Sequence, residues 1–274
     1  MKQIKNIFKG ISFLLFSWAL LVPAASAQGK LELGFHYSSW SVDVIRGLVE
    51  DMFGDALESA LEDDFLSAIQ DDYPYLEQES YEQDVSFDSS GDNFGFGMRW
   101  YPGGYNGSFS LGLSVEKTTM RVALTDVYAR MDLKPDAYFD ADASAEYIIK
   151  PLSFHLSFRW DLFPSSRIRP YFTFGLGAAT GTAVEESELS YQYSGQLEVE
   201  GQIQDSYSES ETQTLGELQR ELEDDGEEFS LPGFIPFLQL NLGLKGEITP
   251  NLHLLFDAGI WNGILLRGGI AVRL

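Results

Sequence analysis

Eight short stretches of the chain alternate apolar and polar residues with a period of two. The pattern is clearest after Leu152, where Phe154, Leu156 and Phe158 continue a row of apolar residues at every second position. A strand places such a row on one face, whereas a helix with 3.6 residues per turn spreads it over both sides. Rows of this kind predict eight strands, near residues 31–37, 94–100, 109–115, 152–162, 172–178, 238–244, 252–260 and 266–274.

The connections between these strands fall into two classes. The links after the second, fourth and sixth strands are short and rich in turn formers, as in the segment 102–107. The links after the first, third and fifth strands are long and cover 41–92, 118–150 and 182–234. Long loops on one rim and short turns on the other are typical of bacterial outer-membrane barrels. We therefore predict an all-β fold, an eight-stranded antiparallel up-and-down transmembrane β-barrel with long acidic extracellular loops that contain short helices.

The polar face of the predicted strands carries charges of both signs. An Arg or Lys facing lipid near the midplane costs about 2–4 kcal/mol, so we expect this face to point into the barrel. Eight strands enclose a space that side chains fill, and buried charges must pair, which predicts a structural network and a filled lumen. The predicted network comprises Glu32, His36, Arg99, Glu116, His155, Arg159, Asp161, Lys245, Glu247, His253, Asp257, Arg267 and Arg273.

The start of the chain has the pattern of a secretory signal. Lys2, Lys5 and Lys9 precede an apolar run over 11–22, and an A-x-A cleavage pattern ends at Ala27. The run is shorter than the ~20 residues that a membrane-spanning helix needs. We expect 1–27 to be a signal peptide, 28–274 to be the barrel domain, and the protein to reside in the cell outer membrane.

Taken together, these features resemble the small eight-stranded outer-membrane barrels, the OmpA-transmembrane, OmpX and OmpW-like group. The resemblance covers the whole mature chain and is architectural. The last strand, Gly268–Leu274, resembles that family's terminal assembly signal, with Leu274 in place of the usual Phe. The resemblance implies outer-membrane lipid and the barrel-assembly machinery as partners.

Aromatic residues gather at the ends of the predicted strands. We expect them to form the interfacial girdles of a membrane barrel. A soluble lipocalin-like barrel is the alternative, because the pattern alone does not say which face points inward; the unequal loops favour the membrane. The predicted girdle residues are Trp40, Trp100, Tyr101, Trp160, Phe163, Tyr171 and Trp261.

The acidic excess lies in the loops. The chain has 42 acidic and 18 basic residues, a net charge of −24, which argues against nucleic acid as a partner. Segment 41–92 carries 16 acids and one arginine, a net charge of −15, and segment 182–234 has a net charge of −14. The chain has no cysteine, which excludes disulfides and a thiol nucleophile.

The acidic loops also contain helical patterns. Apolar residues at helical spacing predict an amphipathic helix over 42–70, with Ser41 as N-cap and a Trp40–Ile45 staple. This helix is expected either to fold against the rim of the barrel or to offer an apolar face to a protein or lipid partner. Thr214 and Glu217 match a capping box that opens a second short helix.

An acidic run over 221–228 is a weak candidate for divalent cations. Carboxylate oxygens are the ligands that Ca²⁺ and Mg²⁺ prefer, which singles out Asp224, Asp225 and Glu227. A solvated, repulsive surface is the more ordinary explanation of such a run.

The function expected from these features is a structural or surface-binding role through the acidic loops, in a monomer without a cofactor. A narrow channel or transporter for small solutes is the first alternative, and a lipid-modifying enzyme of the outer membrane is the second. His155 and Ser157 share a face with Arg159 and Asp161, but this face points into the lumen. Because a catalytic group from another strand would also be needed, we expect no enzyme.

Overall fold

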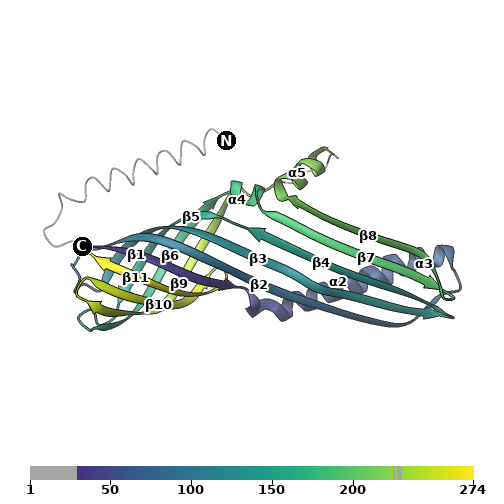
Figure 1. Ribbon diagram of the computed structural model, residues 1–274, viewed down its shortest axis with the longest axis horizontal. Helices are drawn as coiled ribbons and strands as arrows, with labels where there is room; N and C mark the ends of the chain where they lie inside the picture. Colours follow the sequence, from purple (N-terminus) through teal and green to yellow (C-terminus); the bar gives the residue numbers. More distant parts are fainter. Residues whose placement is uncertain (1–29, 225, 227–229) are drawn as a thin grey trace.

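The computed structural model describes residues 30–224, 226 and 230–274. The predicted signal peptide, 1–27, and two of the candidate cation ligands, Asp225 and Glu227, lie outside the described residues. The described chain forms eleven strands in one antiparallel sheet, closed into a barrel at one end and extended as a flat blade at the other (Figure 1). None of the described helices has the length and apolar content needed to cross a membrane.

Eight strands pair side by side into a closed ring. Around the ring the order is β2, β1, β11, β10, β9, β6, β5 and β3, and pairing of β3 with β2 closes it. These strands correspond to the eight alternating segments of the sequence. Their bounds are β1 (Lys30–Ser41), β2 (Glu77–Tyr101), β3 (Phe109–Lys134), β5 (Leu152–Asp161), β6 (Ile168–Thr180), β9 (Phe234–Thr249), β10 (Leu252–Trp261) and β11 (Ile264–Arg273).

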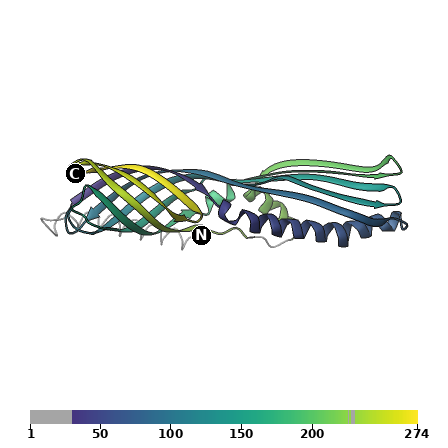
Figure 2. The same cartoon turned by 90° about the horizontal axis from the view of Figure 1, so that it is seen from below.

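Three further strands correct the expectation of eight. They are β4 (Ala137–Ile149), β7 (Glu188–Val199) and β8 (Gln202–Thr214). Together with the far halves of β2 and β3, residues 77–92 and 117–134, they form the five-stranded blade (Figures 1 and 2). The segments expected as long loops are therefore largely strand. Their polar residues also alternate, but acids and serines left little apolar contrast, and only Leu189, Tyr191 and Tyr193 indicated a projecting strand, the one observed as β7.

The polarity of β2 and β3 inverts where the ring ends and the blade begins. Within the ring, Phe94 and Val115 are exposed on the outer face. Further along the same face come Asp92 and Lys117, and from there on it carries mostly polar side chains. On the inner face the change is opposite, since charged groups in the ring give way to apolar residues such as Phe87 in the blade.

A helical segment covers the apolar face of the blade. It runs without a break through η2 (Asp43–Ile45), α2 (Arg46–Ser59), η3 (Ala60–Phe65) and α3 (Leu66–Asp72), close to the predicted span of 42–70. It begins at the rim of the ring and extends alongside the blade (Figure 2). Its buried side chains pack against those of β3, β4 and β7. This core comprises Leu61, Ile69, Leu76, Ala129, Met131, Leu133, Ala137, Phe139, Leu197 and Val199.

The N-terminal joint of this segment differs in part from the expected cap. The Ser41 hydroxyl accepts a hydrogen bond from the Asp43 amide at 2.9 Å, as a capping residue does. The proposed staple is absent from the described contacts: Trp40 is buried at the mouth of the ring, whereas Ile45 is 44% exposed. The buried residues of the helical segment pack on the blade and not on the rim.

Two short helices lie between the blade and the ring. They are α4 (Thr182–Glu185) and α5 (Leu215–Asp224). α5 opens with a reciprocal cap, in which the Thr214 amide donates to Glu217 at 2.9 Å and the Glu217 amide donates to the Thr214 hydroxyl at 3.2 Å. These bonds satisfy amides that the helix itself leaves without a partner.

An apolar cluster fills the blade-side mouth of the ring. It corrects the girdle prediction, because Trp40 and Trp261 are 5% and 0% exposed and belong to this cluster. Tyr101 and Tyr171 are also buried and point inward, whereas Trp160 and Phe163 are exposed. The residues of the mouth cluster are Trp40, Met120, Ile149, Ala179, Val184, Phe237, Trp261 and Leu265.

Candidate functional site

The ring encloses the predicted charged residues. Ten of the thirteen are buried, and His36, Arg99 and Glu247 are half-buried. Strand parity explains this arrangement, since positions of one parity along each strand face the same side of the sheet. The enclosed groups form linked clusters from the turn end of the ring to the mouth.

The cluster at the turn end is centred on Glu32. Lys245 donates a hydrogen bond to the Glu32 carboxylate and another to the Tyr101 hydroxyl, the latter at 3.0 Å. Tyr101 in turn donates to Glu32 at 3.2 Å, and Arg273 Nε lies 3.5 Å from the same carboxylate. Four strands thus meet at one carboxylate, which leaves the charges of Lys245 and Glu32 matched in a fully enclosed site.

A second pair lies beside this cluster at the turn end. Arg169 donates to Glu247 at 3.1 Å, and His253 Nε2 lies 4.0 Å from the same carboxylate. Arg169 is a sixth inward base that the sequence analysis did not assign.

The middle of the ring is held by Tyr171 and Asp257. The Tyr171 hydroxyl donates to Asp257 at 2.6 Å, and Asn241 donates to the other oxygen of that carboxylate. The Arg159 guanidinium lies 4.1 Å from the centre of the Tyr171 ring, and Arg267 Nε is 4.0 Å from Asp257. Asn241 and Tyr171 thus hold Asp257 between the two arginines.

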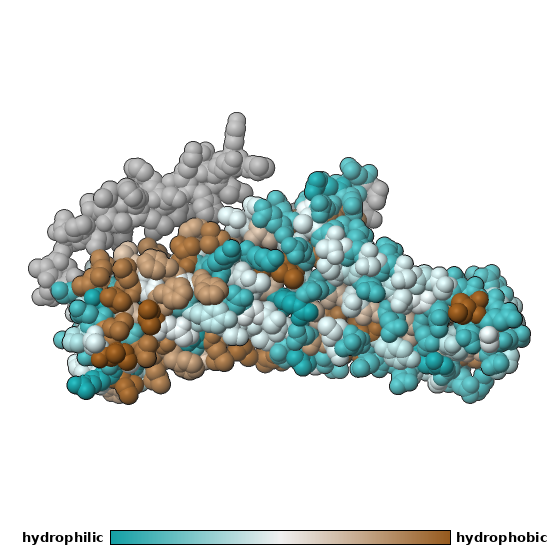
Figure 3. All heavy atoms as spheres, viewed as in Figure 1, coloured by the Kyte–Doolittle hydropathy of each residue, from teal (hydrophilic) through white to brown (hydrophobic). Residues whose placement is uncertain are grey.

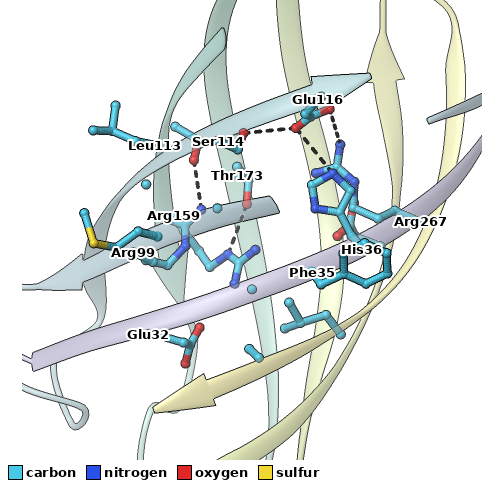
Figure 4. Close-up of a pocket in the computed structure, with 18 of the residues that line it drawn as sticks. Glu32, Phe35, His36, Arg99, Leu113, Ser114, Glu116, Arg159, Thr173 and Arg267 are labelled. Atoms are coloured by element: carbon cyan, nitrogen blue, oxygen red, sulfur yellow. Dashed lines mark hydrogen bonds and ion pairs between the residues drawn. The ribbon is translucent and has the colours of Figure 1, made fainter. Parts of the chain in front are cut away.

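Below the mouth cluster, Glu116 is the main acceptor. Asn93 and Ser114 each donate to it at 3.0 Å. His36 Nε2 lies 3.4 Å and Arg267 3.7 Å from its oxygens (Figure 4). Groups from β1, β2, β3 and β11 therefore converge on this carboxylate.

The free space between these groups is small. A cavity of about 60 Å³ lies among residues that include Arg99, Glu116, Arg159 and Arg267 (Figure 4). This space has room for a few water molecules, in keeping with the narrow interior that eight strands enclose.

The histidine and serine singled out on β5 are not partners. Ser157 accepts a hydrogen bond from Arg99 at 2.8 Å, whereas His155 Nε2 lies 2.7 Å from the Ser153 hydroxyl. His155 Nδ1 and both oxygens of the buried Asp161 have no hydrogen-bond partner among the described residues. A nucleophilic triad needs a third group that orients the imidazole, and none lies at this nitrogen.

The outer face of the blade carries a second candidate site. A broad depression of about 560 Å³ crosses β3, β4, β7 and β8. Its lining is polar, consisting of Tyr128, Arg130, Asp140, Asp142, Ser194, Gly195, Gln196, Ser206, Tyr207 and Ser208.

Ion pairs and hydrogen bonds order the side chains of this depression. Arg130 donates to Asp132 at 2.9 Å and to Asp140 at 3.1 Å, and it lies 4.3 Å from the centre of the Tyr138 ring. The Ser80 hydroxyl donates to Asp132, and this bond, together with Arg130, lowers the pKa of that carboxyl. Partial burial and the nearby Asp140 raise the pKa of Tyr128.

The acidic run near α5 contributes no metal centre within the described residues. Asp224 is the last residue of α5. Among the residues whose positions the structure describes, no three histidine or acidic side chains are grouped closely enough to hold a metal ion.

Sequence reasoning missed several groups of the interior network, among them Tyr101, Tyr171 and Arg169. Parity was the signal that could have found them. Tyr101 shares the parity of Arg99, and Tyr171 shares that of Arg169. The position of Tyr101 and Tyr171 at strand ends suggested that they belong to interfacial girdles. A strand end near a barrel rim, however, presents an inner face as well as an outer one.

Neither a protein-family model nor a curated protein matches the chain. Among solved structures, it is similar to Neisserial surface protein A (10% identity, 90% of this chain and 97% of that one, TM-score 0.29). It is also similar to the translocator domain of autotransporter NalP from Neisseria meningitidis (10% identity, 98% and 96%, TM-score 0.24). The β domain of the Bordetella autotransporter BrkA gives 8% identity, 90% and 100% coverage and a TM-score of 0.22. Because these scores lie below 0.5, we infer function from the chain's own surfaces.

Proposed function

We propose that the chain is an outer-membrane β-barrel protein in which the ring is a sealed membrane anchor and the blade is a surface-exposed binding element. The observation that carries this proposal is the inversion of polarity along β2 and β3. In water, one continuous pair of strands has no reason to expose Phe94 and Val115 and then to bury Phe87 on the opposite face. A boundary between lipid and water at Asp92 and Lys117 explains the inversion.

The exterior of the ring supports this boundary. Leu242 is 69% exposed and Phe256 60%, and apolar side chains cover the ring while polar ones cover the blade (Figure 3). Soluble monomers rarely expose contiguous apolar patches above a few hundred Å². On β5 the outward row from Leu152 to Leu162 is about 25 Å tall at the usual strand rise and tilt, which matches the apolar band of membrane barrels.

A sealed interior favours an anchor over a narrow channel. The interior cavity measures about 60 Å³, and the mouth cluster, with Trp261 fully buried, lies across the blade-side end. An ion moving through the ring would have to displace both the mouth cluster and the paired charges beneath it. Pairs such as Lys245–Glu32 are costly to break.

The interior also supports a non-enzymatic role. The Ser153–His155 pair is buried within the ring and has no carboxylate at His155 Nδ1 among the described residues. A lipid substrate would approach the outer wall, which the inward-facing hydroxyl of Ser153 does not reach.

The blade supplies the proposed binding surface. It projects beyond the ring and carries the polar depression of about 560 Å³, lined by carboxylates, hydroxyls, an amide and one guanidinium. Groups of these types recognise polar ligands through hydrogen bonds. We also propose that the barrel-insertion machinery recognises β11, which pairs with β1 in the ring.

Location and exposure can be tested together, because the chain has no cysteine of its own. A Ser206→Cys variant places a thiol in the depression, and a Ser110→Cys variant places one inside the ring, where Ser110 is fully buried. In intact cells a membrane-impermeant maleimide is expected to label Ser206→Cys only, while Ser110→Cys reacts after unfolding. Recovery of the protein in the soluble periplasmic fraction would overturn the anchor, and labelling of Ser206→Cys only in broken cells would overturn surface exposure.

Planar-bilayer recordings separate the anchor from the channel. The purified protein is expected to give no large, stable conductance. A Trp261→Ala variant opens the mouth cluster and so tests the polar network beneath it alone. This variant should also give no large, stable conductance, because the network still obstructs the ring. Steady conductance by the unaltered protein would reject the sealed anchor in favour of the channel.

A further inference from the structure

The segment formed by η2 and α2 presents two opposite sides with different surroundings. One side faces the blade, where Gly54 is buried and Leu57 packs against the blade core. The other side faces away from the blade and is exposed. We call its apolar residues the rim stripe: Val44, Ile45, Leu48 and Met52, which are 71%, 44%, 61% and 62% exposed. At 100° per residue, they lie along one side of the helix.

The rim stripe is confined to the end of the helix next to the ring. Beyond Phe53, the same outer side of the helix presents Asp55, Ala56 and Ser59. The residues from 44 to 53 span about 14 Å at 1.5 Å per residue. The helix therefore turns from apolar to polar with distance from the ring.

The stripe also begins where the apolar exterior of the ring ends. Ser41, the last residue of β1, pairs with Ile264 of β11. Ile264 and its hairpin neighbour Ile260 are 45% and 54% exposed. Val44 follows Ser41 by three residues, so the stripe begins close in the chain to the residue that pairs with the β10–β11 hairpin.

We propose that the rim stripe contacts lipid of the outer leaflet of the membrane, at the level where acyl chains meet headgroups. This inference rests on the proposed function and extends it from the ring to α2. The headgroup region adds roughly 5–8 Å to each side of the hydrocarbon core. At 1.5 Å per residue, Val44 and Ile45 then lie within this boundary region, Leu48 lies at its outer edge about 6 Å farther along, and Met52, about 12 Å beyond Val44, lies outside it.

The charges beside the stripe favour lipid over a second copy of the chain. Asp51 and Asp55 are exposed beside and beyond its outer end, and segment 41–92 carries a net charge of −15. Two copies packed through their stripes would bring these carboxylates together.

Insertion of the stripe would fix the blade relative to the membrane. The same helix packs on the blade through Leu57, Leu61 and Phe65. Lipid contact on one side and blade contact on the other make α2 a brace that holds the blade away from the surface.

Depth-dependent fluorescence tests this inference on the full chain in phosphatidylcholine vesicles. Leu48→Cys carries an environment-sensitive fluorophore in the stripe, and Ser59→Cys carries the same fluorophore on the same side of α2, about 16 Å farther along the helix. Phe154→Cys, on the outer face of β5, reports contact between lipid and the ring. Each variant is first checked for the folded barrel by its heat-modifiable mobility on gels.

Brominated phosphatidylcholine is expected to quench the labels at positions 48 and 154 and to leave the label at position 59 unquenched. An aqueous quencher is expected to show the reverse. If position 154 is quenched and position 48 is as water-accessible as position 59, the rim stripe does not contact lipid and the inference is overturned while the anchor stands. If position 154 also remains in water, the anchor itself fails. Shielding of position 48 that follows protein density and not bromination would indicate a second copy and would likewise overturn the inference.

Discussion

In the ring, β2 and β3 turn their apolar side chains outward, whereas in the blade the same strands turn them inward, towards α2 and α3. The ring buries charges, as at Lys245–Glu32, and exposes rows of leucine and phenylalanine. The blade buries Phe139 and Met131 and exposes its ion pairs, as at Lys134–Glu79. The backbone of β2 and β3 is continuous across this change. The sheet therefore does not determine which of its faces is apolar; the environment around the ring and around the blade does.

This comparison also separates two ways of stabilising a sheet. The ring depends on pairing of most of its buried charges, because an unpaired buried charge is costly; both oxygens of Asp161 are an exception among the described residues. The blade depends on apolar packing of a helical layer on a sheet, and its surface charges contribute little. Substitutions of the same type should therefore have very different effects in the two regions.

The largest effect is expected from Lys245→Met. The substitution leaves Glu32 enclosed with Arg273 as its remaining cation, and loss of one partner of a buried pair costs about 3–5 kcal/mol. The matched change in the blade, Lys134→Met, removes a pair whose side chains are 58% and 51% exposed and should cost about 0–1 kcal/mol. Urea unfolding from vesicles, followed by tryptophan fluorescence, measures both. Equal losses of unfolding free energy in the two variants would contradict the distinction between ring and blade. Partial recovery of stability in a Glu32→Gln/Lys245→Met double variant would identify the unpaired Glu32 carboxylate as the cause.

A smaller, local effect is expected from Phe139→Ala in the blade. Phe139 is 2% exposed, and its ring centre lies 3.9 Å from that of Phe65. Its truncation should loosen the helical layer by about 3 kcal/mol, at the lower end for such changes, because the layer can settle onto the alanine. Protease cleavage within 46–72 should increase while the heat-modifiable mobility of the barrel stays unchanged. Tyr138→Ala, on the opposite face of the same strand, is the control; a simultaneous loss of barrel mobility would mean that blade and ring unfold as one unit.

The tightness of the ring can be tested at its glycines. A Cβ on Gly259 would lie 2.1 Å from the Leu240 carbonyl oxygen, whereas one on Gly34 would meet its nearest neighbour at 3.7 Å. Gly259→Ala is therefore expected to destabilise the ring by about 1–3 kcal/mol through overpacking, and Gly34→Ala should be tolerated. The same urea titration distinguishes them. Tolerance of both substitutions would mean that the strands can move apart at this contact.

The smallest effect concerns pH at the joint between ring and blade. Hydrogen bonds from Ser89, with contributions from Ser41 and Arg46, hold the pKa of Asp43 below its ordinary value of 3.8. A lowered pKa stabilises the folded joint fully above pH 3.8, and this contribution is lost as pH falls through the folded-state value. Protection from hydrogen exchange at 43–50, measured relative to the intrinsic exchange rate at each pH, should therefore fall below pH 3.8. Asp43→Asn should abolish this step and the exposed control Asp55→Asn should retain it; a step that persists without Asp43 would assign it to another group.

Much of the ring could be read from the sequence. Rows such as Leu152–Leu162 marked its strands, and parity placed Glu32, Lys245 and Asp257 on the face that the structure encloses. The capping residues Thr214 and Glu217 likewise marked the start of α5. All of these signals depend on positions close together in the chain.

Most of the blade was not predicted because its alternation has little contrast; only Leu189, Tyr191 and Tyr193 indicated a projecting strand, where β7 lies. In β8, polar residues occupy nearly every position, so neither face stands out as apolar. Its pairing with β7, and that of β7 with β4, joins segments far apart in the sequence. Parity already placed Trp40 and Trp261 inward, with His36 and Asp257, but only closure of the ring creates the mouth that these side chains fill.

The sequence by itself determined which residues share a face, because side-chain parity along a strand is a local property of the backbone. It also determined where the acidic excess lies. Only the tertiary structure decided that eight strands close while three continue as a blade, that Glu32 meets Lys245, and that α2 has one apolar side packed and one exposed. Those outcomes depend on pairing between distant segments, and the free energy of such pairing is set by the neighbours that closure brings together.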